Sequence, residues 1–252
     1  MNSYEAILRA IKQGLDSKAA KLLELNYDGV SLHHKKKLFE ETIKRGMHHT
    51  LKIILSCDMI DPSVNNNHAI RFTSQNGHDK VVKLLLSDER VNPSHYHSLA
   101  IQWASQNGHE KVVEILLSDE RVDPSIRNKY VIEQTSKNGH EKVVKLLLSD
   151  ERVDPSTSNN LTIRHASKYG HEKVVELLLS DERVDPSAQN NYAIQFASRY
   201  GHEKVVELLL SDKRVNPSAQ NNFAIQWASQ RGHKKVVELL LSDKRVRDTW
   251  KS

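Results

Sequence analysis

The sequence predicts an all-α solenoid of stacked helix-turn-helix units. Two observations carry this prediction. Six glycines recur every 31 residues, each followed directly by histidine, and all six prolines keep the same interval. A fixed period in this range is typical of chains in which each unit buries its apolar face only against its neighbours. The glycines are Gly77, Gly108, Gly139, Gly170, Gly201 and Gly232, and the prolines are Pro62, Pro93, Pro124, Pro155, Pro186 and Pro217.

The unit around Gly201 illustrates the expected elements. Residues 192–199 place apolar side chains on one side at helical spacing, which predicts a first helix. Gly201 can take the left-handed conformation that ends a helix at little steric cost. A second helix is expected over about residues 203–210, and an Asp-Pro-Ser or Asn-Pro-Ser turn then leads to the next unit. The expected buried face of the second helix is Val205, Val206, Leu209 and Leu210.

Two further glycines extend the array towards the N-terminus. Gly46 lies 31 residues before the first of the six, and Gly14 lies 32 residues before Gly46, so eight helical pairs are expected. Terminal units of repeat arrays are commonly divergent. Trp250 is expected to fold back over the last unit. We predict a single domain over residues 1–252, with divergent units at 1–61, six regular units at 62–241 and a charged tail at 242–252.

Composition excludes several classes of protein. Cys57 is the only cysteine, which rules out an intramolecular disulfide and favours a reducing compartment. The first residues lack the apolar core of a secretory signal, and charge interrupts every apolar stretch, so we expect a cytoplasmic protein without a membrane span. The net charge is +5, but lysine and glutamate alternate along the second helices. A mixed face of this kind does not favour nucleic-acid binding, which usually needs a concentrated basic stripe.

The stretch Gly-His-Glu-Lys-Val-Val-Glu-Leu-Leu-Leu, which begins at Gly201, resembles the second-helix signature of ankyrin repeats. Upstream, Ile194, Ala197 and Ser198 fall where that family has Leu and Ala-Ala. The resemblance covers nearly the whole chain. It implies an ankyrin-type solenoid that binds a protein partner without catalysis or cofactors. The repeats look most like the shortened arrays of amoebae, chytrid fungi and large DNA viruses, and a viral source would place the protein in the host-cell cytoplasm or nucleus.

The chain departs from the family pattern in its loops. The usual ankyrin unit has about 33 residues, whereas this one has 31. We therefore expect short loops or reduced β-hairpins between the helical pairs. The Thr-Pro that usually starts the first helix is missing. Five residues could replace its threonine as helix N-caps, namely Asn67, Ser98, Asn160, Asn191 and Asn222.

The 14 histidines raise the question of a metal site. Six of them hold one position at the start of each second helix, and adjacent solenoid layers are about 10 Å apart. Ligands of one ion must lie at about 2.1 Å from it, so these histidines are expected to form hydrogen bonds at the interhelix turns. The pairs His33-His34 and His48-His49 lack companion cysteines, and we predict no metal site. Cys57 has no histidine partner at a telling spacing, so no catalytic centre is predicted.

Positions that differ between near-identical units point to a binding face. The two residues before each repeat glycine change from neutral amides to basic residues and tyrosine along the chain. In the resembling family these positions line the concave binding face. The candidate partner-binding residues there are Lys137, Lys168, Tyr169, Arg199, Tyr200, Gln230 and Arg231, with Tyr96, Arg127 and Lys129 along the rim. We assign the aromatic residues of a second variable stripe to the core; the stripe is Phe72, Trp103, Gln134, His165, Phe196 and Trp227.

The functional hypothesis is that this face captures an acidic or phosphorylated segment of an unidentified protein, with the chain as a monomer. Aromatic and arginine side chains are typical of interface hot spots, which supports it. A second hypothesis is a structural or self-associating scaffold. A third, less favoured, is nucleic-acid binding through the basic residues, which would weaken steeply with salt.

Overall fold

A computed structural model describes residues 3–125 and 128–250, and within these ranges the chain is helical without any strand. It divides into two compact units, Met1–Ile126 and Arg127–Ser252. The all-α prediction is therefore confirmed, and the loops are turns without reduced hairpins in the described ranges. None of the described helices is long and apolar enough to cross a bilayer. The single domain over residues 1–252 stays a prediction.

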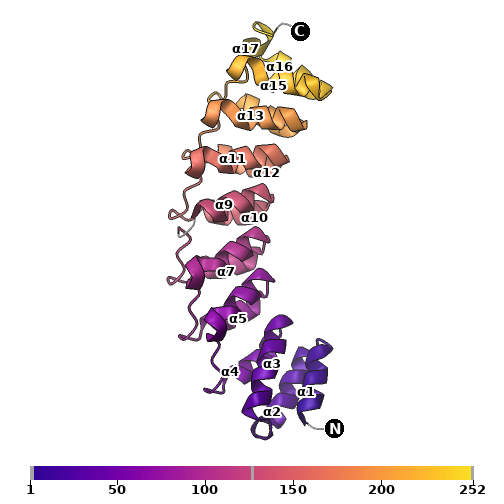
Figure 1. Cartoon of the computed structure of the whole chain (residues 1–252), viewed down its shortest axis with the longest axis vertical. Helices are drawn as coiled ribbons and strands as arrows, with labels where there is room; N and C mark the ends of the chain where they lie inside the picture. The colour runs from indigo at the N-terminus through magenta and orange to yellow at the C-terminus, as the bar shows by residue number, and fades with distance from the viewer. Residues whose placement is uncertain (1–2, 126–127, 251–252) are drawn as a thin grey trace. The chain divides into compact units, whose positions relative to one another are not determined.

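The first unit contains four helical pairs (Figure 1). Within each pair we call the first helix inner and the second outer. Inner helices contact inner helices and outer helices contact outer ones along the stack. The helices are α1 (Ser3–Lys12), α2 (Asp16–Leu25), α3 (Leu32–Lys44), α4 (His48–Leu55), α5 (Val64–Gln75), α6 (Asp79–Leu86), α7 (His95–Gln106) and α8 (Glu110–Leu117), with a 3-10 turn at Tyr27–Gly29.

The second unit repeats the arrangement with four more pairs and a short terminal helix. Helix α17 packs against α16, buries Val246, and leaves Trp250 half-buried. Thr249 Oγ1 lies 3.1 Å from Asn222 Nδ2, which joins the tail to the inner helix of the last pair. That Trp250 itself covers this pair stays a prediction. The helices are α9 (Asn128–Lys137), α10 (Glu141–Leu148), α11 (Thr157–Tyr169), α12 (Glu172–Leu179), α13 (Ala188–Tyr200), α14 (Glu203–Ser211), α15 (Ala219–Gln230), α16 (Lys234–Ser242) and α17 (Lys244–Arg247).

The core consists of one thin apolar layer per pair. In the pair formed by α13 and α14, Val205, Val206 and Leu209 are fully buried, as the helical spacing predicts. Leu210 is only half-buried, so that part of the prediction is wrong. Small residues on the inner helix, such as Ala193 and Ala197, are also fully buried and let the helices pack closely.

The turn between the two helices of a pair is built from two successive repeats. Gly170 ends α11 with a φ of 75°. The ring of His202, from the next repeat, lies over it: a Cβ on Gly170 would be 2.6 Å from His202 Nδ1. His202 Nε2 lies 2.9 Å from the carbonyl oxygen of Lys168 and must donate, because a carbonyl only accepts. The predicted histidine hydrogen bonds are confirmed for His109, His171, His202 and His233, which join neighbouring repeats, whereas the buried Nε2 of His78 has no partner among the described residues.

The loop aspartates and arginines also join neighbouring repeats. Asp181 Oδ2 pairs with Arg183 at 2.6 Å. Arg183 then donates to the carbonyl oxygens of Val153 at 2.9 Å and Leu148 at 3.0 Å, both in the preceding repeat. The hydrogen bond from Arg183 lowers the pKa of the Asp181 carboxyl. The same pairing lowers the pKa of Asp88, Asp119, Asp150, Asp212 and Asp243.

We expect stability to fall on acidification because these carboxyl pKa values are depressed in the folded state. Their contribution is complete above the unfolded aspartate pKa of about 3.9 and is lost as the pH falls through the folded values. Urea unfolding measured between pH 7 and pH 2.5 should show the decline, starting near pH 4. Asp181→Asn should weaken the pH dependence. An unfolding midpoint that does not change with pH over this range would contradict the expectation.

The inner helices α5, α7, α11, α13 and α15 each have a left-handed turn near their start. In α13 the residues Gln189, Asn190 and Asn191 have φ between 54° and 66°. Asn191 was expected to cap its own helix, but its Oδ1 accepts a hydrogen bond of 2.6 Å from the backbone N–H of Asn216 in the next loop. Gln195 donates from Nε2 to the carbonyl oxygen of Asn190 at 2.7 Å. Thus the N-cap prediction is wrong for Asn191, and this asparagine links successive repeats.

The left-handed conformation of Gln189, whose side chain is exposed, predicts how glycine at this position would change the free energy of unfolding. A non-glycine residue in this region costs about 1–2 kcal/mol, and the extra flexibility of unfolded glycine offsets part of the gain. Gln189→Gly should therefore raise the free energy of unfolding by about 0.5–1 kcal/mol. Gln189→Ala is the matched control, because it shortens the side chain and keeps the strain. Equal stability of the two variants would argue against the left-handed turn.

Candidate interaction surface

Seven of the ten candidate residues lie at the C-terminal ends of the inner helices in the second unit. Lys137 ends α9, Lys168 and Tyr169 end α11, and Arg199 and Tyr200 end α13. Gln230 ends α15, and Arg231 is its C-cap residue. Because adjacent inner helices pack side by side, these residues form a row across the stack.

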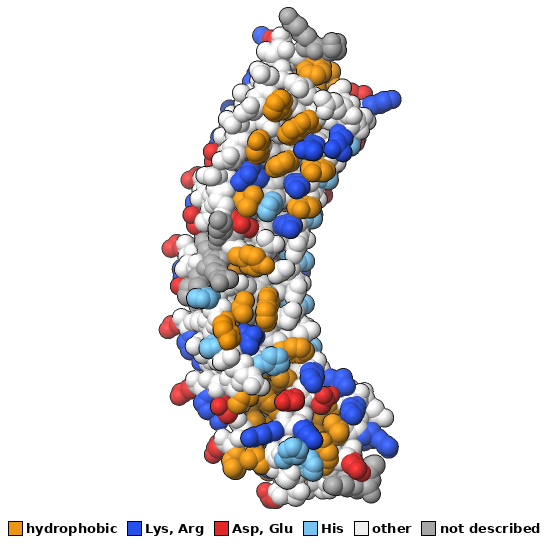
Figure 2. All heavy atoms as spheres, in the orientation of Figure 1, with side chains coloured by type: hydrophobic (Ala, Val, Ile, Leu, Met, Phe, Trp, Pro, Cys, Tyr) orange, Lys and Arg blue, Asp and Glu red, His pale blue; other side chains and the backbone are white. Residues whose placement is uncertain are grey.

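Figure 2 shows basic side chains among hydrophobic ones over α11, α13 and α15, and the hydrophobic neighbours of the basic residues in this row are aromatic. The ammonium nitrogen of Lys168 lies 5.4 Å from the centroid of the Tyr169 ring and 5.9 Å from the centroid of the Tyr200 ring. Arg199 Cζ lies 5.1 Å from the centroid of the Trp227 ring in the next repeat. These separations are within the range of cation–π attraction. We call the set the cation–aromatic array; its members are Lys137, Lys168, Tyr169, Phe196, Arg199, Tyr200 and Trp227.

The repeat turns hold the array in position. Histidine side chains of the following repeat bond to the backbone carbonyls of Lys137, Lys168 and Arg199, at 2.8, 2.9 and 3.1 Å. The Tyr200 ring stacks on His202 with centroids 6.4 Å apart. Basic residues in the last turn of a helix also complement its dipole. The array is therefore fixed by the same contacts that join the repeats.

The basic residues of this row carry charge that no carboxylate pairs with in the described part of the chain. They are Lys137, Lys168 and Arg199 of the array, and Arg231 beside it. The pKa of His165 is lowered by burial and then by the charges of Lys137, Arg164 and Lys168. On the outer helices, by contrast, Lys235 Nζ lies 3.1 Å from Glu203 Oε2. The inner-helix face therefore presents a positive potential with exposed rings, Tyr169 at 42% and Tyr200 at 41%.

The assignment of the second variable stripe to the core is wrong for this surface. Phe196 and Trp227 are half-buried and lie beneath the cations of the array. Each also contacts a ring of its own helix: Trp227 stacks on Phe223, and Phe196 lies tilted at 48° against Tyr192. A signal was available in the sequence, because the stripe varies between repeats whereas Val205, Val206 and their equivalents do not.

The three remaining candidates lie elsewhere. Tyr96 belongs to the first unit, where its hydroxyl accepts a hydrogen bond from Asn66 Nδ2 at 2.9 Å and its ring lies 5.3 Å from the Arg71 guanidinium. Its exposed ring is bound to neighbours of its own unit. Arg127 lies outside the described residues. Lys129 lies in α9, but its side chain is outside the described part of the chain.

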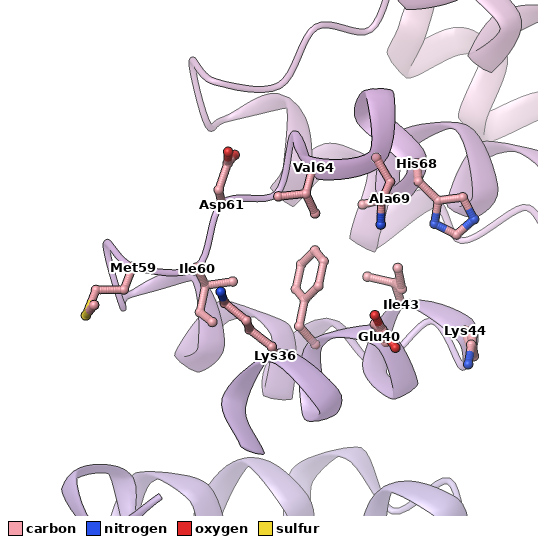
Figure 3. A pocket seen from close by; sticks show the side chains of 12 residues that line it. Lys36, Glu40, Ile43, Lys44, Met59, Ile60, Asp61, Val64, His68 and Ala69 are labelled. Carbon is pink, nitrogen blue, oxygen red and sulfur yellow. The ribbon is translucent and has the colours of Figure 1, made fainter. Parts of the chain in front are cut away.

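The first unit has a cavity of about 500 Å³ between α3 and the start of α5 (Figure 3). Ile43 of α3 and Ala69 of α5 lie on opposite sides of it. The rim carries both signs of charge, with Lys36 and Lys44 beside Glu40 and Asp61. The cavity could accept an apolar side chain, but its mixed rim does not select a charge.

Comparison with known proteins gives one family. A model of ankyrin repeats in three copies matches residues 39–128 and 163–249. The second range includes the C-terminal part of α11 and the whole of α13 and α15, which carry most of the array. No curated protein matches the chain. The periodic glycines, the stacked helical pairs and this match agree, and the chain belongs to the ankyrin-repeat family.

Proposed function

We propose that the protein is a non-catalytic interaction module whose cation–aromatic array binds an acidic or phosphorylated segment of a partner protein. Ankyrin repeats are generally protein–protein interaction modules. The observation that carries the finer proposal is the row of basic residues over aromatic rings, without carboxylate partners among the described residues. Because the repeat contacts fix this row before binding, association loses little conformational entropy.

The spacing of the array suits an extended segment. Successive basic residues belong to adjacent repeats, and packed helices lie about 10 Å apart. An extended chain advances about 3.3 Å per residue, so acidic residues three positions apart would reach Lys168 and Arg199 in turn. The exposed tyrosine rings offer apolar contact to the residues between them. Arginine and tyrosine are also typical anchors of protein interfaces.

Nucleic-acid binding is the second candidate, because single strands also use basic grooves and aromatic stacking. This candidate predicts that every single-stranded nucleic acid of sufficient length would bind, whatever its sequence.

A self-associating scaffold is the third candidate, and its molecular mass in solution would rise with protein concentration. We place the protein in the cytoplasm as a monomer, as the sequence suggests.

The test is a capture experiment with two variants of equal charge. Lys168→Gln with Arg199→Gln removes two cations of the array. Lys173→Gln with Lys204→Gln removes two outer-helix lysines of the same repeats, which lie near Glu141 and Glu207. Each variant and the wild type would be immobilised and exposed to a cell lysate and, separately, to an acidic peptide, a neutral peptide and single-stranded RNA.

The proposal expects partners and acidic peptide to be retained by the wild type and by the outer-helix variant, and lost by the array variant. Equal retention by both variants would overturn the array as the binding site. Retention of RNA in place of the acidic peptide, lost in the array variant, would establish the nucleic-acid alternative.

A further inference from the structure

A carboxylate and two imidazoles converge on the outer face of the first unit. Asp16 is the first residue of α2, and His48 and His49 open the neighbouring outer helix α4. Asp16 Oδ2 lies 3.0 Å from His49 Nδ1 and 3.4 Å from His48 Nδ1. The ligand atoms of the three residues all lie within 4.8 Å of one another. Sequence spacing could not show this grouping, because Asp16 precedes the histidines by more than thirty residues.

These separations fit the coordination of one small ion. With bonds of about 2.1 Å, two ligand atoms lie about 3.0 Å apart at a right angle and about 3.4 Å apart at a tetrahedral angle. The distances from Asp16 Oδ2 to His49 Nδ1 and to His48 Nδ1 already have these two values in the structure without an ion. An ion would take the place of the proton that His49 Nδ1 now shares with Asp16 Oδ2.

The carboxylate is oriented by its other contacts. Asp16 Oδ1 accepts hydrogen bonds from Thr50 N at 2.9 Å and Thr50 Oγ1 at 2.8 Å, and Oδ2 accepts one from His49 N at 3.0 Å. Such outer contacts hold a metal ligand in place and commonly affect affinity. Capping of α4 accounts for these backbone contacts. It does not account for two imidazoles whose Nδ1 atoms face the same carboxylate oxygen.

The site is accessible from solvent. The side chains are 56% exposed in His49, 30% in His48 and 19% in Asp16. An arriving ion would keep water in its remaining positions. The chain's other adjacent pair differs, since His34 stacks on Tyr4 at 3.8 Å and no carboxylate groups with the pair among the described residues.

We propose that Asp16, His48 and His49 bind a divalent transition-metal ion, with Zn²⁺ as the favoured occupant. Two imidazoles and one carboxylate are a ligand set that Zn²⁺ uses in proteins, whereas Mg²⁺ and Ca²⁺ prefer oxygen ligands alone. The bound ion would tie α2 to α4 in the divergent N-terminal repeats. This site is independent of the array and of the function proposed for it.

The test is a titration of the full chain with Zn²⁺ against a chromophoric chelator, and with Co²⁺ followed by its visible absorption. His48→Gln with His49→Gln removes two ligands from the surface. Asp16→Asn keeps one oxygen, which can accept from Thr50 N as Oδ1 does now, and removes the anionic ligand. His33→Gln with His34→Gln is the matched control, because it removes the same number of imidazoles.

The wild type should bind one equivalent of Zn²⁺ more tightly than any other. That equivalent should be lost in the His48/His49 variant, be weakened about tenfold or more by Asp16→Asn, and be unchanged in the control. Circular dichroism of each variant would confirm that the helices remain. The proposal is overturned if the wild type and the His48/His49 variant bind the first equivalent with equal affinity.

Discussion

Replacing Gly201 with alanine is expected to lower the free energy of unfolding by about 2–3 kcal/mol. Gly201 has a φ of 75°, where a side chain costs about 1–2 kcal/mol. The new Cβ would lie 2.7 Å from His233 Nδ1, closer than a real contact allows. His233 must then move away and lose its hydrogen bond to the Arg199 carbonyl oxygen, which contributes about 1 kcal/mol. Urea unfolding of the full chain measures the effect.

Gly232 provides the matched control for this substitution. It has the same φ of 75°, but a Cβ there would meet no atom within 4 Å. Gly232→Ala should therefore cost only the conformational part, about 1–2 kcal/mol. A second control changes His233 to alanine first, after which Gly201→Ala should also cost only that part, since the two residues interact directly. Equal losses from Gly201→Ala with and without His233 would contradict the stacking of repeats through this contact.

Most of the fold could be predicted from the sequence because residues at equivalent positions of the repeats have the same structural role. The helical pairs, the glycine turns and the buried valines all follow from position within a unit. The repeat pattern does not show whether a side chain bonds within its own repeat or to an adjacent one. His202, Arg183 and Asn191 all bond to an adjacent repeat, through pairs separated by 34, 30 and 25 residues. The N-cap prediction was wrong for this reason, since an asparagine before a helix is commonly its cap.

The candidate surface was predicted in part. Variation between repeats located Lys168, Tyr169, Arg199 and Tyr200 correctly on one row of inner-helix ends. The aromatic residues beneath them were assigned to the core because an apolar side chain at helical spacing usually faces inwards. Phe196 and Trp227 lie instead at the edge of that face, where the basic residues of neighbouring repeats cover them. Their role depends on packing between repeats.

The basic residues and the tyrosines of the array should contribute separately to its affinity for an acidic segment. Lys168→Gln with Arg199→Gln should weaken binding about 30-fold or more, since anchor residues of an interface contribute at least about 2 kcal/mol. The variant also lacks two positive charges. The attraction between these charges and the acidic segment is the part of the affinity that salt screens. The slope of log affinity against log salt concentration should therefore become shallower. Calorimetry with one acidic peptide between 50 and 300 mM salt would measure both quantities.

Tyr169→Ser with Tyr200→Ser should behave differently. The rings carry no charge, so their loss should weaken binding at every salt concentration and leave the slope unchanged. If both variants changed the slope equally, the tyrosines would act by positioning the cations they contact, Lys168 and Arg199, at 5.4–5.9 Å. If neither variant changed affinity, the acidic segment would bind elsewhere. The proposed roles, in which basic residues attract the segment and tyrosines add contact area, are supported only if the salt dependence becomes shallower in the Lys168/Arg199 variant and not in the Tyr169/Tyr200 variant.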